Sequence, residues 1–278
     1  MTDTPHHRTA PPGLEARLQA MDPAREPGVR WLEIDGVPCI VKRRRPGVAR
    51  GVSYAIRYVR AFAIGVTCKI ALGEFPPPNL LLRNGLPYEA ERLKFLSQAG
   101  CAVPNIWFEG PGVLALEHVG DNVALLLRAA PQPERLRLAR ALAEDLAVFH
   151  ARGFWHGGAQ VRNQTMRDGE LWRIDFEENI GGALSLPLSQ AYDVFQLLSS
   201  LMAMRHVSDA DMREIGPVVL ETYFARHADA DVRAQLTRLG RMVCRITDAL
   251  RPVLGRVQWR DVKGFYRVAD TLRLLLKS

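Results

Sequence analysis

Residues 149 to 178, the stretch that decides the fold of this chain, read FHARGFWHGGAQVRNQTMRDGELWRIDFEE. The Asp168-Gly169 pair is a two-residue turn signal between two runs rich in β-forming residues, so it predicts a hairpin. Such a hairpin brings Asn163, just before its first strand, close to Asp175, at the end of its second. An amide and a carboxylate that meet there could hold a divalent ion on the phosphates of a nucleotide.

The order of these residues resembles the catalytic and metal-binding loops of the protein-kinase-like superfamily. His156, Asn163 and Asp175 stand at family-like spacings, and Asp175 is followed by Phe176. The likeness is greatest to atypical bacterial branches, namely lipopolysaccharide-core and Kdo kinases, RIO kinases, and aminoglycoside and choline kinases. It implies a two-lobed α+β fold, with a small β-sheet lobe and a helical lobe, that uses ATP and Mg²⁺. Asn163 and Asp175 would be the metal ligands, and we expect His156 to support the metal loop rather than act on substrate.

Gly158 is the main departure from the family pattern. The family places its catalytic Asp two residues after the His, but this chain has Gly158 there, and no Asp or Glu occurs between Asp145 and Asp168. A glycine cannot accept the proton of a substrate hydroxyl. Three functions therefore stay open: an ATP-dependent phosphotransferase, a nucleotide-binding pseudokinase scaffold, and a transferase of AMP. We favour the phosphotransferase, acting on a small-molecule, sugar or lipid-linked envelope substrate.

The N-terminal third contains the residues that would bind the nucleotide phosphates. Asp35-Gly36 marks a second two-residue hairpin, whose second strand leads into Lys42. This strand resembles the kinase strand whose Lys reaches the α- and β-phosphates. Glu89 opens a predicted helix over residues 88–96, in the register of the Glu that pairs with that Lys, and Glu91 is the second candidate. The alternatives are a solvated strand end for Lys42 and a surface charge pair for the glutamates.

The apolar run from Val113 to Glu117 continues into His118-Val119-Gly120 and resembles the hinge between the two kinase lobes. Backbone groups of the hinge bind adenine, so the resemblance makes Glu117 and Val119 cofactor-binding positions. Beyond the hinge the hydrophobic spacing predicts a mainly helical lobe. Asp193 resembles the helix Asp that braces the catalytic loop, although a favourable charge at a helix N-terminus would also explain it. The main predicted helices span 132–152, 209–226, 229–253 and 258–276.

A basic insertion near residues 43–72 interrupts the predicted small lobe. The chain carries a net charge of +7, and residues 42–72 contain no acidic side chain. Arg50, Arg57 and Arg60 would share one face of a helix. Such a face suits an anionic membrane surface as well as it suits plain exposure to water. Nucleic acid is the weaker candidate partner, because nothing else in the chain resembles a nucleic-acid module.

The chain begins with a polar, Pro-rich stretch, residues 1–12, that we expect to be disordered. The predicted small lobe then covers residues 13–116 and the predicted helical lobe residues 117–278. The sequence contains neither a secretory signal nor the roughly 20 consecutive apolar residues that a membrane span needs. We therefore expect a cytoplasmic protein, with peripheral attachment to the inner face of the cytoplasmic membrane as the alternative that the basic insertion leaves open.

Overall fold

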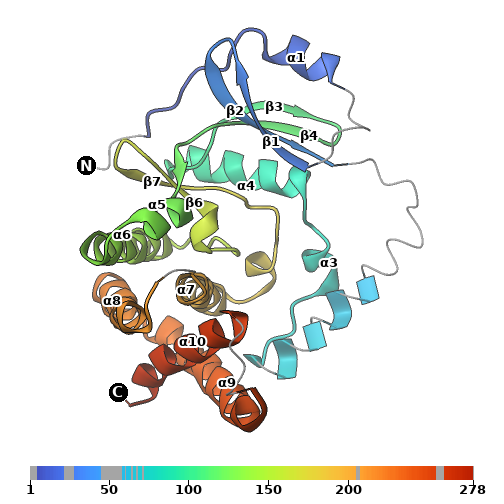
Figure 1. Cartoon of the computed structure of the whole chain (residues 1–278). Coiled ribbons are helices and arrows are strands. Elements are labelled where there is room, and N and C mark those ends of the chain that lie inside the picture. Colours follow the sequence, from blue (N-terminus) through green and yellow to red (C-terminus); the bar gives the residue numbers. More distant parts are fainter. Residues whose placement is uncertain are drawn as a thin grey trace.

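The computed structural model describes residues 5–21, 28–44, 58–59, 61–63, 65–66, 68–70, 72–204, 207–254 and 260–277. The chain folds into two lobes, a small lobe built on an antiparallel sheet and a larger lobe built from helices (Figure 1). This is the α+β, two-lobed arrangement that the sequence predicts. Arg50, Arg57 and Arg60, on which the membrane prediction depends, lie outside the described residues.

Four strands in the order β1-β2-β4-β3 form the sheet of the small lobe. Their bounds are β1 Gly28–Ile34, β2 Val37–Arg43, β3 Ile106–Gly110 and β4 Val113–Glu117. The predicted hairpin at Asp35-Gly36 is confirmed, since β1 pairs with β2 directly across this turn. Both turn residues have positive φ, 51° and 74°, as a tight two-residue connection requires.

Helices α1 (Leu14–Ala20) and α4 (Leu86–Gln98) cover opposite faces of this sheet. Side chains alternate between the two faces of a strand, so β2 serves both helices. Cys39 and Val41 pack in the cluster that includes α1, whereas Ile40 packs against the cluster that includes α4. Lys42 is two residues beyond Ile40 and therefore lies on the α4 face of the sheet. A short helix, α3 (Pro78–Leu81), precedes α4.

A second, smaller sheet joins the lobes below the hinge, in the order β5-β6-β7. Its strands are β5 Asp121–Asn122, β6 Gln164–Arg167 and β7 Glu170–Arg173. The hairpin predicted at Asp168-Gly169 is confirmed by the pairing of β6 with β7. Its register places Asn163 beside Ile174, whose N–H donates to the Asn163 carbonyl at 3.0 Å.

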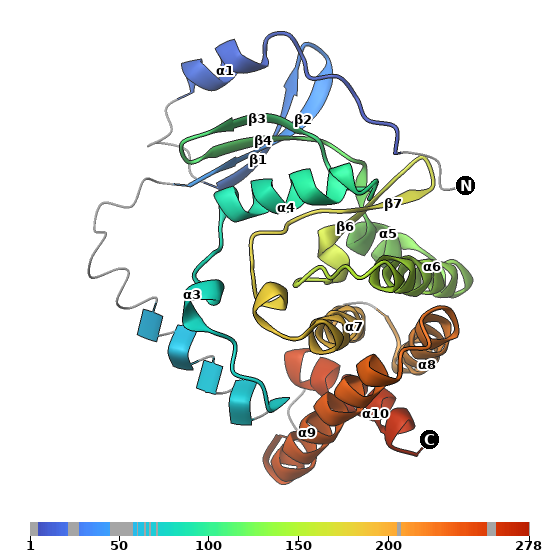
Figure 2. The same cartoon turned by 180° about the vertical axis from the view of Figure 1, so that it is seen from behind.

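The helical lobe is arranged around α7 (Leu186–Met202), which the other helices of this lobe surround (Figure 2). Leu188, Val194, Leu198 and Leu201 of α7 are fully buried, as expected of a helix that is apolar on most sides. No helix in the described part of the chain is both long and apolar enough to span a bilayer. The remaining elements are α5 Val123–Ala129, α6 Gln132–Ala151, α8 Asp209–Arg226, α9 Ala230–Leu254 and α10 Arg260–Lys277, with 3-10 turns Val161–Asn163 and Gly181–Ala183.

Residues 5–12, which we call the N-terminal strap, differ from the sequence-based expectation of disorder. The strap runs from the β6–β7 hairpin up to α1 on the outside of the small lobe (Figure 1). Pro5 and Pro11 are buried in it, and Gly13, the residue before α1, donates its N–H to the Asp35 carboxylate at 2.7 Å. Its order therefore comes from contacts with distant parts of the chain, which composition alone does not show.

Candidate functional site

Lys42 lies between three carboxylates at the cleft between the lobes. Its Nζ is 2.8 Å from Glu89 Oε1, 2.9 Å from Asp175 Oδ1 and 3.4 Å from Glu177 Oε1. Lys42 and Glu89 are both buried. The pairing of the β2 Lys with a Glu of α4 is thus present as predicted, and Glu89 rather than Glu91 is the partner. Glu91 is exposed and pairs with Arg83 instead.

Burial and ion pairing act in opposite directions on this group. Burial alone would lower the pKa of Lys42, but the carboxylates of Glu89 and Asp175 outweigh it and raise that pKa above its ordinary value. Burial raises the pKa of Glu89, and the ammonium of Lys42 opposes that shift. Glu89 Oε1 also accepts the N–H of Phe176 at 3.3 Å, so it ties α4 to the metal-loop candidate as well as to β2.

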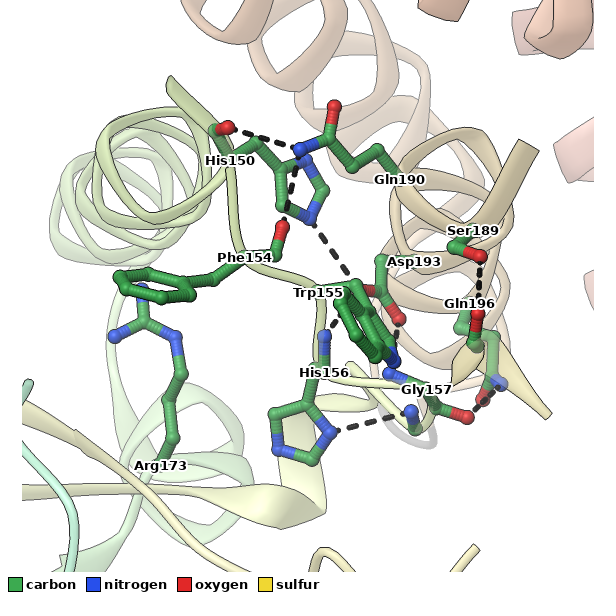
Figure 3. Close-up of polar contacts among 12 residues, drawn as sticks. His150, Phe154, Trp155, His156, Gly157, Arg173, Ser189, Gln190, Asp193 and Gln196 are labelled. Atoms are coloured by element: carbon green, nitrogen blue, oxygen red, sulfur yellow. Dashed lines mark hydrogen bonds and ion pairs between the residues drawn. The ribbon is translucent and has the colours of Figure 1, made fainter. Parts of the chain in front are cut away.

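Asp193 of α7 holds the loop that contains His156 and Gly157. Its side chain is fully buried and accepts the N–H of His156 at 2.6 Å and the N–H of Gly157 at 2.8 Å (Figure 3). His150 Nε2 lies 3.3 Å from the same carboxylate. The expected bracing contact is therefore present, and its anchor is the most buried helix of the large lobe.

His156 acts as a structural link between the two loops. Its Nε2 donates to the Ile174 carbonyl at 3.1 Å, while its Nδ1 accepts the N–H of Gly158 at 3.2 Å. The ring stacks on Phe176 with centroids 4.3 Å apart. Burial lowers the pKa of His156 to about 4, so the ring is neutral near pH 7 and matches this donor–acceptor pattern. These contacts agree with the expectation that His156 supports the metal loop.

Two adjacent glycines shape the loop in different ways. Gly157 has φ of 84°, and an added Cβ would lie 3.3 Å from the Glu178 carbonyl, so a side chain there is disfavoured. Gly158 lies outside the left-handed region, and an added Cβ would meet Asn163 Nδ2 at 3.4 Å and His156 Nδ1 at 3.6 Å. Those are ordinary contacts. The backbone therefore has room for the Cβ of a side chain at position 158, where the kinase pattern places an Asp.

Asn163 and Asp175 are suited to share a divalent cation. Asn163 Nδ2 donates to the Gly158 carbonyl at 2.8 Å, and its amide oxygen has no hydrogen-bond partner among the residues that the structure describes. Asp175 is 42% exposed and uses one oxygen for Lys42, so its second oxygen faces the cleft side. Hard oxygen donors of this kind are those that Mg²⁺ prefers. Oxygens of Glu89, Asp175 and Glu177 also lie within 4.8 Å of one another, and the ammonium of Lys42 contacts all three groups.

A cavity of about 870 Å³ opens beside these groups. Gly158, Asn163 and Asp175 line it, together with Tyr192 of α7 and residues of the loop between α3 and α4. Glu178 also lines the cavity, and its carboxylate has no hydrogen-bond or ion-pair partner among the residues that the structure describes. Burial and the nearby charge of Glu178 raise the pKa of Tyr192 to about 12. The cavity therefore adjoins the proposed metal ligands and contains an unpaired acidic group.

The hinge position Glu117 has a role that sequence reasoning missed. Its buried carboxylate accepts from His7 Nδ1 at 2.7 Å, from the N–H of Arg8 at 2.9 Å and from Arg167 Nη1 at 2.6 Å. These contacts outweigh the effect of burial and lower the pKa of Glu117. The carbonyl of Val119 accepts from the hydroxyl of Thr165 at 2.8 Å. The Glu117 side chain thus clasps the N-terminal strap, and no pattern in the sequence links these segments.

A small antiparallel lobe, a buried Lys–Glu pair, and an Asn–Asp pair below a loop braced from a core helix are together the features of a two-lobed, protein-kinase-like fold. A scan against known protein families finds no matching family model for the chain. A stretch of 91 residues is 28% identical to the KEOPS complex subunit Bud32 of Pyrococcus abyssi, covering 32% of this chain and 41% of that protein. The chain thus matches under half the length of this relative. Among solved structures, a MAP kinase of Leishmania major is 14% identical, with a TM-score of 0.33 over 93% of this chain and 80% of its own.

Proposed function

We propose that this protein is an ATP-dependent phosphotransferase that works with Mg²⁺. The single observation that carries the proposal is the Lys42 ammonium, held by Glu89 and Asp175 next to a cavity of about 870 Å³. In this role Lys42 would contact the α- and β-phosphates, and Glu89 would fix its position. The backbone at Glu117 and Val119 would meet the adenine. Asn163 and Asp175 would hold the ion, which when bound neutralises the charge of the phosphates.

In the transfer step, an acceptor hydroxyl oxygen bonds to the γ-phosphorus while the bond from that phosphorus to the β–γ bridging oxygen breaks. ADP leaves, and the hydroxyl proton must go to a base. Phosphoryl transfer has a loose transition state, so positioning and charge stabilisation supply most of the rate. The general-base share is about 10²- to 10⁴-fold. A slow phosphotransferase is therefore compatible with Gly158.

Glu178 is the better substitute base of the two neighbouring glutamates. Glu177 is engaged by Lys42 and Arg44, which draws its carboxylate to the small-lobe side. Both glutamates line the cavity, but only the carboxylate of Glu178 is unpaired among the residues described. We propose that Glu178, directly or through a water, takes the proton that the family's catalytic Asp would accept.

The acceptor that we propose is a small-molecule, sugar or lipid-linked hydroxyl. Polar groups line the cavity floor, where Gln160 Nε2 donates to Gln196 Oε1 at 2.8 Å and the guanidinium of Arg162 is exposed. Such groups suit a hydroxyl-rich acceptor, and a cationic Arg162 suits one that carries an anionic group. The likeness to lipopolysaccharide-core and Kdo kinases, carried by the His156 and Asp175 loops, supports the same class.

The first experiment measures thermal stabilisation by Mg·ATP. Wild type should melt at a higher temperature with Mg·ATP than without, because a ligand that binds only the folded state stabilises it. Asp175→Ala should lose the metal-dependent part of this shift. Asp231→Ala, which changes an exposed aspartate at the start of α9, is the matched control and should keep it. An unchanged shift in Asp175→Ala would remove Asp175 from the metal site.

The second candidate, a nucleotide-binding pseudokinase, is favoured by the absence of a carboxylate at Gly158. Gly158→Asp separates the two functions, because the structure leaves ordinary space for a Cβ there. A phosphotransferase should gain turnover, up to about 10²-fold or more, when the base is restored. If wild type and Gly158→Asp both bind Mg·ATP and neither turns it over with any acceptor, the scaffold function is correct. If the protein does turn over ATP, the mass of the modified acceptor distinguishes phosphoryl transfer from AMP transfer.

A further inference from the structure

The described helical residues between 58 and 72 expose a row of large apolar side chains, although Leu72 at the end of the segment is buried. Ala61 and Gly65 are buried and Cys68 is half-buried against the core of the large lobe. On the opposite side, the outer face presents four large apolar residues at spacings of three and four. These are Val59 at 67%, Phe62 at 51%, Val66 at 38% and Ile70 at 81% exposure.

Four exposed large apolar side chains in a row are unusual for a surface helix, which ordinarily buries such side chains. At Gly65 the inward side has no room for a side chain. A Cβ added at Gly65 would lie 2.9 Å from the Phe75 ring and 3.2 Å from the Pro76 carbonyl. Phe62 lies edge-to-face against Phe75 with ring centroids 5.7 Å apart, and Phe75 is itself 39% exposed. A contiguous exposed apolar face of this kind marks an interaction site rather than a consequence of folding.

Cationic groups lie on this segment and next to its end. Lys69 is exposed beside Ile70 and donates to the Gly73 carbonyl at 3.1 Å. The end of the segment lies next to α9, where the guanidinium of Arg238 packs over Gly73 (Figure 1, Figure 2). Arg238 and Arg241 are exposed and have no ion-pair partner within the described residues. Both arginines line a groove of about 1020 Å³ together with Leu275 and Leu276 of α10.

We propose that the outer face of Val59, Phe62, Val66 and Ile70 inserts into the interface of a membrane that contains anionic lipids. An amphipathic segment with an apolar face and flanking basic groups binds such interfaces through apolar burial and attraction to lipid headgroups. Nucleic acid would pair with the basic groups, but it would not bury the exposed apolar side chains of Val and Ile. Docking this way also explains why a segment on the surface keeps its large residues outside.

The position of the membrane also favours one class of acceptor, a conclusion that rests on the proposed phosphotransfer. Ala61, on the inner side of the same segment, lines the large cavity beside Gly158 and Asp175. A membrane bound to the outer face would therefore lie one helix thickness from that cavity. Among the acceptors considered above, this geometry favours a lipid-linked hydroxyl.

The test is flotation of the full-length protein with vesicles of phosphatidylcholine, with and without phosphatidylserine. Wild type should float with the anionic vesicles. Phe62→Gln/Ile70→Gln should bind at least about tenfold more weakly, a change of about 1.4 kcal/mol. Leu125→Gln/Val148→Gln removes apolar residues of similar exposure, 60% and 51%, elsewhere on the surface and should bind like wild type. Equal melting temperatures establish that each variant is folded.

Three outcomes would overturn the proposal. Wild type that stays unbound even at low salt, or a Phe62/Ile70 variant that floats like wild type, would do so directly. A wild-type dimer in solution that the same variant converts to monomer, without any lipid binding, would assign the face to a second copy of the chain. Asp175→Ala should still float, so a failure of phosphotransfer and a failure of docking give different results.

Discussion

Replacing Asp193 with Asn tests whether α7 holds the catalytic-loop backbone. The Asp193 carboxylate is fully buried and accepts two backbone N–H groups, from His156 at 2.6 Å and from Gly157 at 2.8 Å. Asparagine has nearly the same shape but presents only one acceptor oxygen. One of the two N–H groups must then face an NH₂ group, and the other bonds to a neutral acceptor.

The size of the effect follows from these two losses. A buried donor left without an acceptor costs about 1–3 kcal/mol, and exchanging a charged for a neutral acceptor costs about 1 kcal/mol. Asp193→Asn should therefore lower the free energy of unfolding by about 2–4 kcal/mol. Total stabilities are only about 5–15 kcal/mol, so the variant should fold but with a clearly weakened loop.

Urea unfolding followed by circular dichroism measures this difference. The matched control is Asp209→Asn, since Asp209 pairs with Arg267 at the surface and is 59% exposed. An exposed pair contributes at most about 1 kcal/mol. If Asp193→Asn costs no more than this control, the hydrogen bonds to His156 and Gly157 do not hold the loop, and the reasoning fails.

Three further predictions follow from buried charges. Lys42→Met should cost about 3–5 kcal/mol in urea unfolding, because it leaves Glu89 buried without its counter-charge; adding Glu89→Gln should recover most of that, and no recovery would contradict the pairing. The pKa of His156 is about 4 in the folded chain against an ordinary 6.5, so stability should fall by about 3 kcal/mol between pH 6.5 and 4 as the unfolded state takes up the proton; His156→Gln should flatten this pH dependence, and an equally steep curve would contradict it. Glu117→Gln should speed amide hydrogen exchange across residues 5–12, and unchanged exchange would show that the strap is held by other contacts.

Much of the fold could be predicted because it depends on turn residues and hydrophobic spacing within short stretches of the chain. The two Asp-Gly turns fix the hairpins, and the register of the second places Asn163 beside the residue before Asp175. The expected helix over 209–226 matches α8 residue for residue, and the expected helices over 132–152, 229–253 and 258–276 agree with α6, α9 and α10 within two residues. Each of these features depends on residues close together in the chain, where turn chemistry and hydrophobic spacing are informative.

The features that could not be predicted depend on distant segments. The N-terminal strap is ordered because Glu117 and Arg167 bind it, and its polar, Pro-rich composition gives no sign of that. The residue type at Glu117 was also uninformative, because the expected hinge function resides in the backbone and the strap that its side chain binds is distant in the sequence. The outward large residues at Phe62 and Ile70 also follow from what packs on the other side of the segment, in particular Phe75 against Gly65.

The contacts that hold the N-terminal strap can form only late in the synthesis of the protein. His6 leaves the ribosome before Arg167, which binds its carbonyl and follows 161 residues later in the chain. At about 5–20 residues per second, the strap waits roughly ten seconds or more for its partner. During that time the first strands can pair while the strap remains open to proteases and chaperones. The strap can therefore dock only after the β6–β7 hairpin has been synthesised. A bulky fusion before the strap would interfere with folding at this late step.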